Sequence, residues 1–188
     1  MDKILYINAC VRPESRTRKL AEIILERLHG EVEEINLEKE HIEPLTKESL
    51  DHRDKLLEDG IMEAPELKYA RQFSEADIIL FAAPYWDLSF PASVKNYMEA
   101  INVCGITFNY TEEGIPVGLC KAKRLIYVTT AGGPVIEPNM GYEYIRNLTR
   151  IFHGIENAEY YKAECLDVVG ADVQGIMEKA KAEIISNV

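Results

Sequence analysis

Three short segments of the sequence combine residue types that could hold a small ligand. The first is Ser15-Arg16-Thr17, which opens a helical pattern. Hydroxyls and free backbone amides at a helix N-terminus favour an anion such as phosphate. Arg12 and Arg18 add positive charge in an otherwise acidic chain. The alternative is an ordinary capped helix whose arginines are solvated.

The second segment is Pro84-Tyr85-Trp86-Asp87-Leu88, directly after the apolar run Ile78–Ala83. The run is typical of a central parallel strand covered on both faces, and Pro84 ends it. A flat apolar loop with backbone amides suits a planar heteroaromatic molecule. The alternatives are an aromatic loop packed under a neighbouring helix or in a dimer interface.

The third segment is Thr130-Ala131-Gly132-Gly133, which follows the apolar run Arg124–Thr129. Paired glycines let a backbone approach a ligand closely and leave amides free to donate. The alternative is a tight turn, which a lone Gly-Gly also forms.

The elements that must position these segments alternate between strand and helix along the chain, which predicts a parallel sheet with helices on both faces. Five strands suit the flavodoxin-like order 2-1-3-4-5 in one domain spanning 1–188, with the ends of the first, third and fourth strands facing one crevice. The predicted strands are Lys3–Ala9, Val32–Leu37, Ile78–Ala83, Arg124–Thr129 and Ile155–Tyr161. The predicted helices are Ser15–Gly30, Lys47–Leu57 within a charged excursion over His41–Ala64, Glu66–Ser74, Pro91–Ile101, Met140–Phe152 and Asp172–Ile185, and Gly105–Leu119 is expected to be a long loop or hairpin.

Composition limits the partners of the chain. The 188 residues include 21 Lys and Arg and 32 Asp and Glu, so the formal net charge is 21 − 32 = −11. Such a surface repels phosphate backbones, which argues against nucleic acids and anionic membranes as partners. No signal peptide or apolar run of about 18 residues is present, so no membrane span is expected.

The cysteines and histidines carry no metal-site pattern. Cys10, Cys104, Cys120 and Cys165 are scattered without CxxC or Cys/His ligand spacing, and the four histidines are equally isolated. We therefore expect no metal, and free thiols in a reducing cytoplasm. The chain also lacks GxGxxG and the P-loop pattern, so neither a Rossmann dinucleotide site nor a nucleoside triphosphatase is supported.

The same motifs resemble those of the flavodoxin-like NAD(P)H:quinone oxidoreductases and FMN-dependent NADH-azoreductases. Pro84-Tyr85-Trp86 followed by Pro91–Tyr97 resembles their flavin loop and the helix after it. The phosphate loop, the third flavin-contacting loop and the segment after the flavin-loop helix are similar to Ser15-Arg16-Thr17 with Leu20, Thr130–Gly133 and Gly105–Gly114. The resemblance covers most of the chain and is weakest over Glu38–Ala64.

This resemblance implies a homodimer with one FMN per subunit. It also implies ping-pong transfer of two electrons from NADH or NADPH to a quinone, an azo compound or a similar small electrophile. No catalytic side chain is expected, because the flavin supplies the hydride chemistry. Phe108 and Tyr110 would cover the substrate pocket or serve the core or an interface. The cofactor-binding residues implied are Cys10, Ser15, Arg16, Thr17, Pro84, Tyr85, Trp86, Asp87, Leu88, Thr130, Ala131, Gly132 and Gly133.

Some residues depart from the family pattern. Cys10 stands where azoreductases commonly have a serine, so one hydroxyl donor near the phosphate is missing. Tyr85-Trp86 is closer to the quinone reductases that use FAD, but the chain is shorter and lacks an obvious adenine-binding extension, so FMN is expected. Two other classes stay open: a flavodoxin-like electron carrier without its own turnover, and a non-redox esterase, which no Gly-x-Ser-x-Gly elbow supports.

Overall fold

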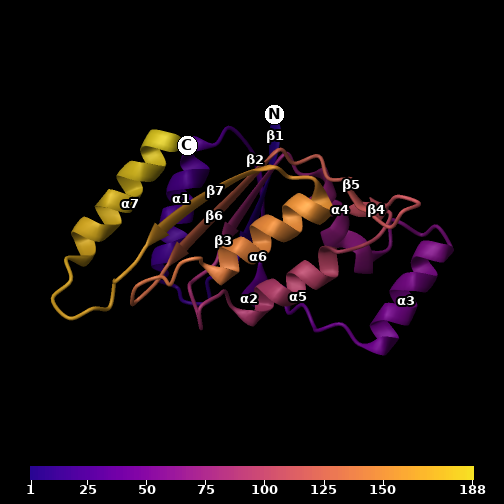
Figure 1. Cartoon of the computed structure of the whole chain (residues 1–188), viewed down its shortest axis with the longest axis horizontal. Helices are drawn as coiled ribbons and strands as arrows, with labels where there is room; N and C mark the ends of the chain where they lie inside the picture. The colour runs from indigo at the N-terminus through magenta and orange to yellow at the C-terminus, as the bar shows by residue number, and fades with distance from the viewer.

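A twisted five-stranded parallel sheet lies between two layers of helices (Figure 1). The computed structural model describes residues 1–188. The strand order is β2-β1-β3-β6-β7, so the predicted 2-1-3-4-5 order is confirmed. The parallel strands are β1 (Asp2–Asn8), β2 (Gly30–Asn36), β3 (Ile78–Ala82), β6 (Arg124–Thr130) and β7 (Asn157–Ala163).

Burial on both faces explains the continuous apolar runs of the central strands β1, β3 and β6, whereas the edge strand β2 is largely exposed. In β1, Leu5 and Ile7 enter a buried cluster of 20 residues, whereas Ile4 and Tyr6 enter a second cluster of 16. The two clusters are of comparable size, so neither face of the sheet is left to solvent. Strands buried in this way show apolar runs rather than alternation, as the sequence does in β3 and β6.

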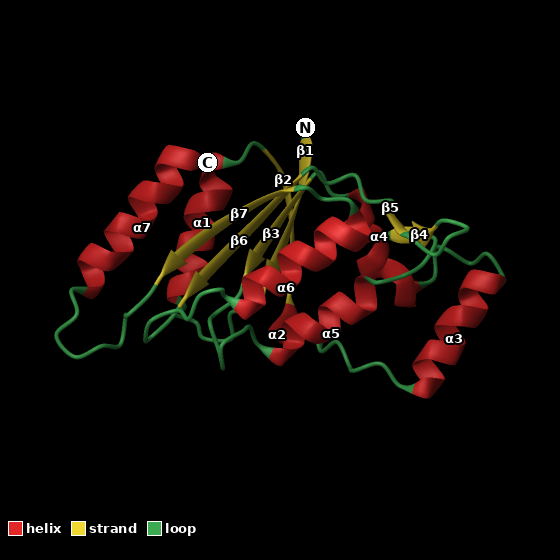
Figure 2. Cartoon of the chain, viewed as in Figure 1, coloured by secondary structure: helices red, strands yellow, loops and turns green.

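Helices supply the two covering layers (Figure 1). One face is covered by α1 and α7, and the other by α4, α5 and α6, while α3 stands at the periphery. Loops gather where the strand arrows end (Figure 2). The helices are α1 (Arg16–Arg27), α2 (Leu37–Glu40), α3 (Lys47–Glu58), α4 (Lys68–Glu75, after a 3₁₀ turn at Pro65–Leu67), α5 (Ala92–Ile101), α6 (Met140–Leu148) and α7 (Val173–Asn187).

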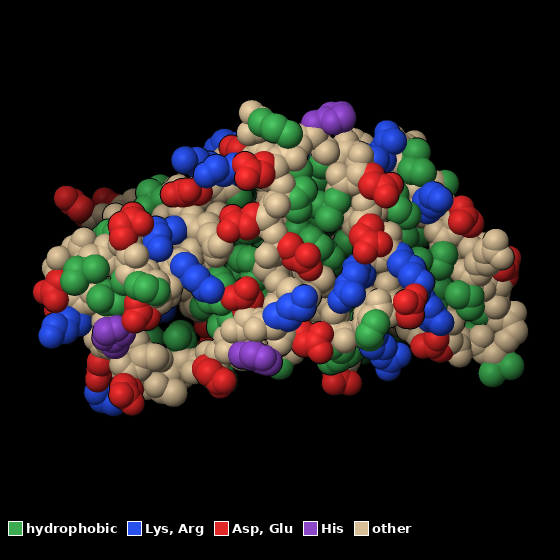
Figure 3. Space-filling view, turned by 180° about the vertical axis from the view of Figure 1, so that it is seen from behind, with side chains coloured by type: hydrophobic (Ala, Val, Ile, Leu, Met, Phe, Trp, Pro, Cys, Tyr) green, Lys and Arg blue, Asp and Glu red, His purple; other side chains and the backbone are tan.

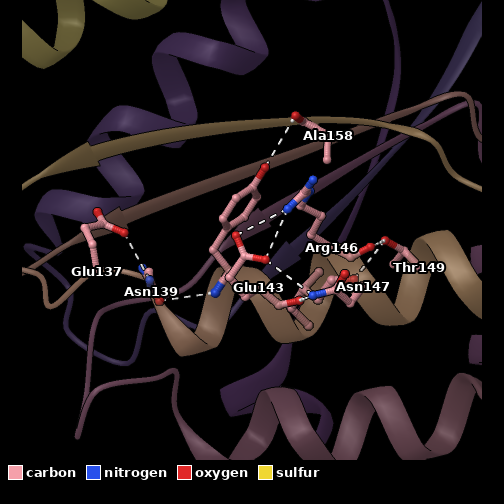
Figure 4. Close-up of polar contacts among 9 residues, drawn as sticks. Glu137, Asn139, Glu143, Arg146, Asn147, Thr149 and Ala158 are labelled. Atoms are coloured by element: carbon pink, nitrogen blue, oxygen red, sulfur yellow. Dashed lines mark hydrogen bonds and ion pairs between the residues drawn. The ribbon is translucent and has the colours of Figure 1, made fainter.

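Helix α6 is fixed by polar contacts at its start and along its length (Figure 4). Asn139 caps it, because its Oδ1 accepts from the amides of Gly141 at 2.9 Å and Tyr142 at 3.2 Å. The Tyr142 hydroxyl donates to the Ala158 carbonyl at 3.4 Å, which ties the helix to β7. These contacts fix the position at which the segment after β6 enters the helix.

The predicted helix Met140–Phe152 is wrong in its last turn, and the predicted fifth strand is displaced by two residues. The chain forms a π-helical turn over Thr149–His153, and Gly154 ends it with φ 75°. The Ile155 amide still donates to the Thr149 carbonyl at 3.1 Å, so Ile155 belongs to this cap and packs into the core. The strand therefore begins at Asn157.

The segment Gly105–Leu119 contains a short hairpin, which confirms the predicted loop or hairpin. Its strands are β4 (Phe108–Tyr110) and β5 (Pro116–Gly118). The Lys121 amide donates to the Ser74 carbonyl at 2.9 Å, so the hairpin returns to the sheet just before β3 and β6 begin. It lies near the amino ends of the strands, away from the arrowheads (Figure 1).

Charged side chains of both signs are interspersed over the face opposite to that of Figure 1 (Figure 3). The net charge of −11 is therefore not gathered into one acidic patch on that face. None of the helices has both the length and the apolar composition needed to cross a bilayer.

Candidate functional site

The loop after β1 presents a capped helix start to the carboxyl edge of the sheet. Ser15 caps α1, since its hydroxyl accepts from the Arg18 amide at 3.3 Å. The amides of Arg16 and Thr17 have no acceptor within the chain. A hydrogen bond of 2.7 Å joins the hydroxyls of Thr17 and Thr130, so this loop is fastened to the end of β6.

The aromatic loop after β3 is a tight turn. Trp86 and Ser89 exchange two backbone hydrogen bonds of 3.1 and 2.8 Å across Asp87 and Leu88, whose φ angles are 50° and 67°. Tyr85 holds this turn beside the next loop, because its amide donates to the Thr130 carbonyl at 3.0 Å. Its hydroxyl in turn accepts from the Ile136 amide at 3.2 Å.

The three loops line one cavity of about 390 Å³ at the carboxyl ends of the strands. Ser15, Trp86 and Gly132 all face it, so the predicted convergence of the three segments is confirmed. The wall residues are Val11, Arg12, Glu14, Ser15, Arg16, Thr17, Pro84, Tyr85, Trp86, Thr130, Ala131, Gly132, Leu166 and Asp167.

Four of the predicted cofactor residues are not part of this wall. Asp87 and Gly133 adjoin the wall residues Trp86 and Gly132, whereas Leu88 is one residue farther along the turn and is largely exposed. Cys10 is buried beneath the first loop, where its amide donates to the Asn8 Oδ1 at 3.0 Å. Burial raises the pKa of the Cys10 thiol, so at neutral pH it adds no negative charge under the phosphate-loop residues.

Phe108 and Tyr110 lie outside the cavity of their own chain. Phe108 is buried against Phe152, with ring centroids 5.1 Å apart, and Tyr110 is half exposed on the hairpin. A single chain therefore does not bring these two rings to the three loops.

A fourth segment, which the sequence analysis did not include, completes the wall. Leu166 and Asp167 follow β7, and their amides donate to the carbonyls of Ala131 and Gly132 at 3.1 and 2.8 Å. The signal was available, because the carboxyl end of the fifth strand reaches the same edge of the sheet as the others. The weak pattern of that strand concealed it.

The charged side chains of the cavity are balanced. Arg16 donates to Asp167 Oδ1 at 2.8 Å and to the Leu166 carbonyl at 3.3 Å. Glu14 pairs with Lys19 at 2.9 Å, and Arg12 forms no ion pair. The cavity thus offers an anion the unpaired Arg12 guanidinium, the Arg16 guanidinium that Asp167 already contacts, and the unpaired amides of Arg16 and Thr17.

A larger hollow of about 720 Å³ lies between β1, β2 and α4, and most of its charged side chains are paired within the chain. Lys3 pairs with Glu75 at 3.4 Å, and Arg71 pairs with Glu63 at the same distance. It contains none of the three predicted segments. We therefore place the candidate site at the smaller cavity, where unpaired donors converge.

Comparison with known proteins shows the family to which the chain belongs. The flavodoxin-like fold family model matches residues 2–188. The FMN-dependent NADH:quinone oxidoreductase 2 of Clostridium acetobutylicum is 42% identical over 97% of this chain and 98% of its own length. The corresponding enzyme of Clostridium beijerinckii is 38% identical over 96% and 94%.

Solved structures agree in fold. An azoreductase from Bacillus anthracis str. Sterne superimposes with a TM-score of 0.85 at 28% identity, over 99% of this chain and 98% of that one. A second structure from that species, an FMN-dependent NADH-azoreductase in complex with FMN, has a TM-score of 0.79 at 22% identity and shares the fold. The chain therefore belongs to the flavodoxin-like family of oxidoreductases that includes the FMN-dependent NADH:quinone oxidoreductases and the azoreductases.

Proposed function

We propose that this protein binds FMN in the three-loop cavity and uses it to oxidise NADH or NADPH and reduce a quinone, an azo compound or a similar small electrophile. The observation that carries the proposal is the convergence of Ser15, Trp86 and Gly132 on one cavity. The relatives named as FMN-dependent NADH:quinone oxidoreductases support both the cofactor and the electron donor, and among donors we favour NADH.

The donor set of the cavity fits FMN. A phosphate suits the amides of Arg16 and Thr17, which lack an acceptor, together with the Ser15 hydroxyl and the Arg16 guanidinium. A flat ring suits the wall formed by Tyr85 and Trp86. Its pyrimidine edge suits the third loop, Thr130–Gly133, in which the amides of Gly132 and Gly133 have no acceptor within the chain.

Bound FMN would accept a hydride from the nicotinamide and pass two electrons to the acceptor. The side chains of the chain bind and orient the cofactor, and none is assigned an acid or base role. A cavity of about 390 Å³ is at the small end of the range for ligand sites. The proposal includes a ping-pong sequence, in which the oxidised nicotinamide leaves before the acceptor binds.

The protein is further proposed to act as a homodimer in which the hairpin of one subunit covers the cavity of the other. Tyr110, Ile115 and Val117 leave an apolar surface on the hairpin, at the opposite end of the sheet from the cavity of the same chain. All four cysteines are free, which supports a cytoplasmic location.

Reconstitution tests the cofactor and the activity together. The purified protein should be yellow, or become so with FMN, release FMN on denaturation, and oxidise NADH only when a quinone or azo dye is present. Parallel assays with NADPH and with FAD measure both preferences. Protein that stays colourless after incubation with either flavin contradicts the proposal, and flavin without turnover of NADH and quinone indicates an electron carrier instead.

Replacing Tyr110 tests the dimer proposal. Tyr110→Ala should raise the KM for the acceptor about fivefold, through loss of a ring contact. It should lower the melting temperature only slightly, because Tyr110 is half exposed and contacts Phe108 edge to face, with ring centroids 5.4 Å apart. Ile61→Ala removes an equally exposed apolar side chain elsewhere and should change neither quantity. A monomeric wild-type protein in sedimentation would refute the arrangement.

A further inference from the structure

Asp167 places a carboxylate against the arginine proposed to hold the phosphate. Its Oδ1 lies 2.8 Å from Arg16 Nη1, and both side chains face the cavity. The pair stays in contact with solvent, since the side chains of Arg16 and Asp167 are 39% and 68% exposed. Arg16 is therefore already neutralised by this chain before any phosphate arrives.

Backbone hydrogen bonds hold Asp167 at the edge of the cavity. The Asp167 amide donates to the Gly132 carbonyl at 2.8 Å, and the Cys165 amide donates to the Gly133 carbonyl at 2.9 Å. Gly132 leaves the room that the carboxylate occupies, because a Cβ there would lie 2.4 Å from Asp167 Oδ2. These hydrogen bonds fasten the segment after β7 to the third loop, and the Asp167 carboxylate faces the loop after β1.

The other carboxylate of the cavity wall is occupied differently. Glu14 pairs with Lys19, at 2.9 Å, and Lys19 is not part of the wall. Asp167 is the wall residue whose charge acts directly on a phosphate-loop guanidinium. Two anions that share one guanidinium repel each other across it, and each weakens the hold of the other.

We propose that Asp167 is an internal competitor for Arg16, which lowers the affinity of the cavity for the phosphate of FMN and so makes the cofactor exchangeable. This inference rests on the proposed function. Because the pair is exposed and screened by salt, the effect is moderate rather than large. Asp167 is in this sense a residue that sets cofactor retention and not a catalytic one.

The test compares two flavins that differ only in the phosphate. Wild-type protein and Asp167→Asn are stripped of flavin, and the dissociation constants of FMN and of riboflavin are measured by quenching of flavin fluorescence. The asparagine keeps the size of the side chain and can still accept from Arg16. We expect FMN to bind roughly fivefold more tightly to Asp167→Asn, and riboflavin to change less than twofold.

Two further variants test whether the change in FMN affinity comes from the contact between Asp167 and Arg16. Glu75→Gln removes one negative charge from the ion pair with Lys3 at the amino end of the sheet and should leave both constants unchanged. In an Arg16→Gln background, Asp167→Asn should lose most of its effect on FMN, because the competition requires the guanidinium.

Each possible result supports or overturns either the inference or the proposed function. FMN binding that Asp167→Asn leaves unchanged or weakens overturns the inference while the proposed function stands, since a weaker constant would mean that the carboxylate positions Arg16 for the phosphate. Tighter binding of both flavins to the same extent also overturns it, because the phosphate would then play no part. Failure of the wild-type protein to bind either flavin overturns the proposed function itself.

Discussion

At the scale of single residues, the aromatic turn contains a conformation that its sequence does not favour. Asp87 and Leu88 have φ angles of 50° and 67°, in a two-residue turn closed by the hydrogen bonds between Trp86 and Ser89. Such turns prefer Asn-Gly, because a side chain crowds the backbone at positive φ. Strain of this kind is typical of binding sites, where the surrounding structure maintains it.

Relieving this strain should stabilise the protein. Replacing Asp87 by Asn and Leu88 by Gly should raise the free energy of unfolding by about 1 kcal/mol, measured by urea denaturation of the flavin-free protein. Leu119→Gly is the control, because Leu119 is similarly exposed but has an ordinary φ, and glycine there should lower the same quantity. A loss of stability in the double variant would contradict the assignment of strain to this turn.

The turn also marks a limit of sequence-based prediction. The loop was predicted from Pro84 and from the aromatic residues, and its place in the cavity wall followed from the end of β3. Its inner geometry could not be predicted, because Asp-Leu carries no signal for positive φ. The turn is held in that shape by the hydrogen bonds between Trp86 and Ser89 and by the contacts of Tyr85 with Thr130 and Ile136.

At the scale of elements, prediction succeeded where the apolar pattern was strong. Strands β3 and β6 are continuous apolar runs, and their ends placed the second and third loops correctly. At β7, whose pattern is mixed, it placed the strand two residues too early and missed Leu166 and Asp167 after it. The π-helical turn before β7 was also missed; the hairpin packs against it, a tertiary contact that local sequence does not encode.

The contact between the hairpin and the π-helical turn predicts that adding one methyl group at Gly118 lowers the stability of the protein markedly. A Cβ on Gly118 would lie 2.2 to 2.3 Å from backbone atoms of His153 and Gly154, which cannot move aside as a side chain could. Gly118→Ala should lower the free energy of unfolding by about 2 kcal/mol, measured by urea denaturation. It should also speed hydrogen exchange at the Leu119 amide, which donates to the Thr107 carbonyl.

The control for this substitution is Gly133→Ala, judged on stability alone. Nothing lies within 4 Å of a Cβ at Gly133, so the free energy of unfolding should not fall there. Equal effects of the two alanines would mean that backbone freedom, rather than the close approach of the hairpin to the π-helical turn, decides the outcome.

At the scale of the whole molecule, the two ends of the sheet have different roles. The carboxyl ends gather polar loops around the candidate site, whereas the amino ends carry the hairpin and the π-helical turn. Phe73, Asn102 and His153 meet beneath that hairpin in the core. A buried ionisable group at this structural end links the stability of the entire fold to pH.

His153 is the group concerned, and it predicts a loss of stability in weak acid. Its ring is fully buried, Nε2 lies 2.8 Å from Asn102 Oδ1, and Nδ1 has no partner. Burial lowers the pKa of His153 to about 4, from an ordinary value of 6.5, because the charged ring cannot be solvated. Between these two values the unfolded chain binds a proton that the folded chain does not.

The free energy of unfolding should therefore fall as the pH drops from about 6.5 to about 4, with a contribution from His153 of about 3 kcal/mol in total. Urea titrations across that range should show a smaller pH dependence for His153→Phe, since phenylalanine cannot take up the proton. His29→Phe is the matched control, since it removes an exposed histidine that forms no ion pair, and it should keep the wild-type dependence. Parallel curves for the wild type and His153→Phe would show that carboxylates alone cause the acid sensitivity.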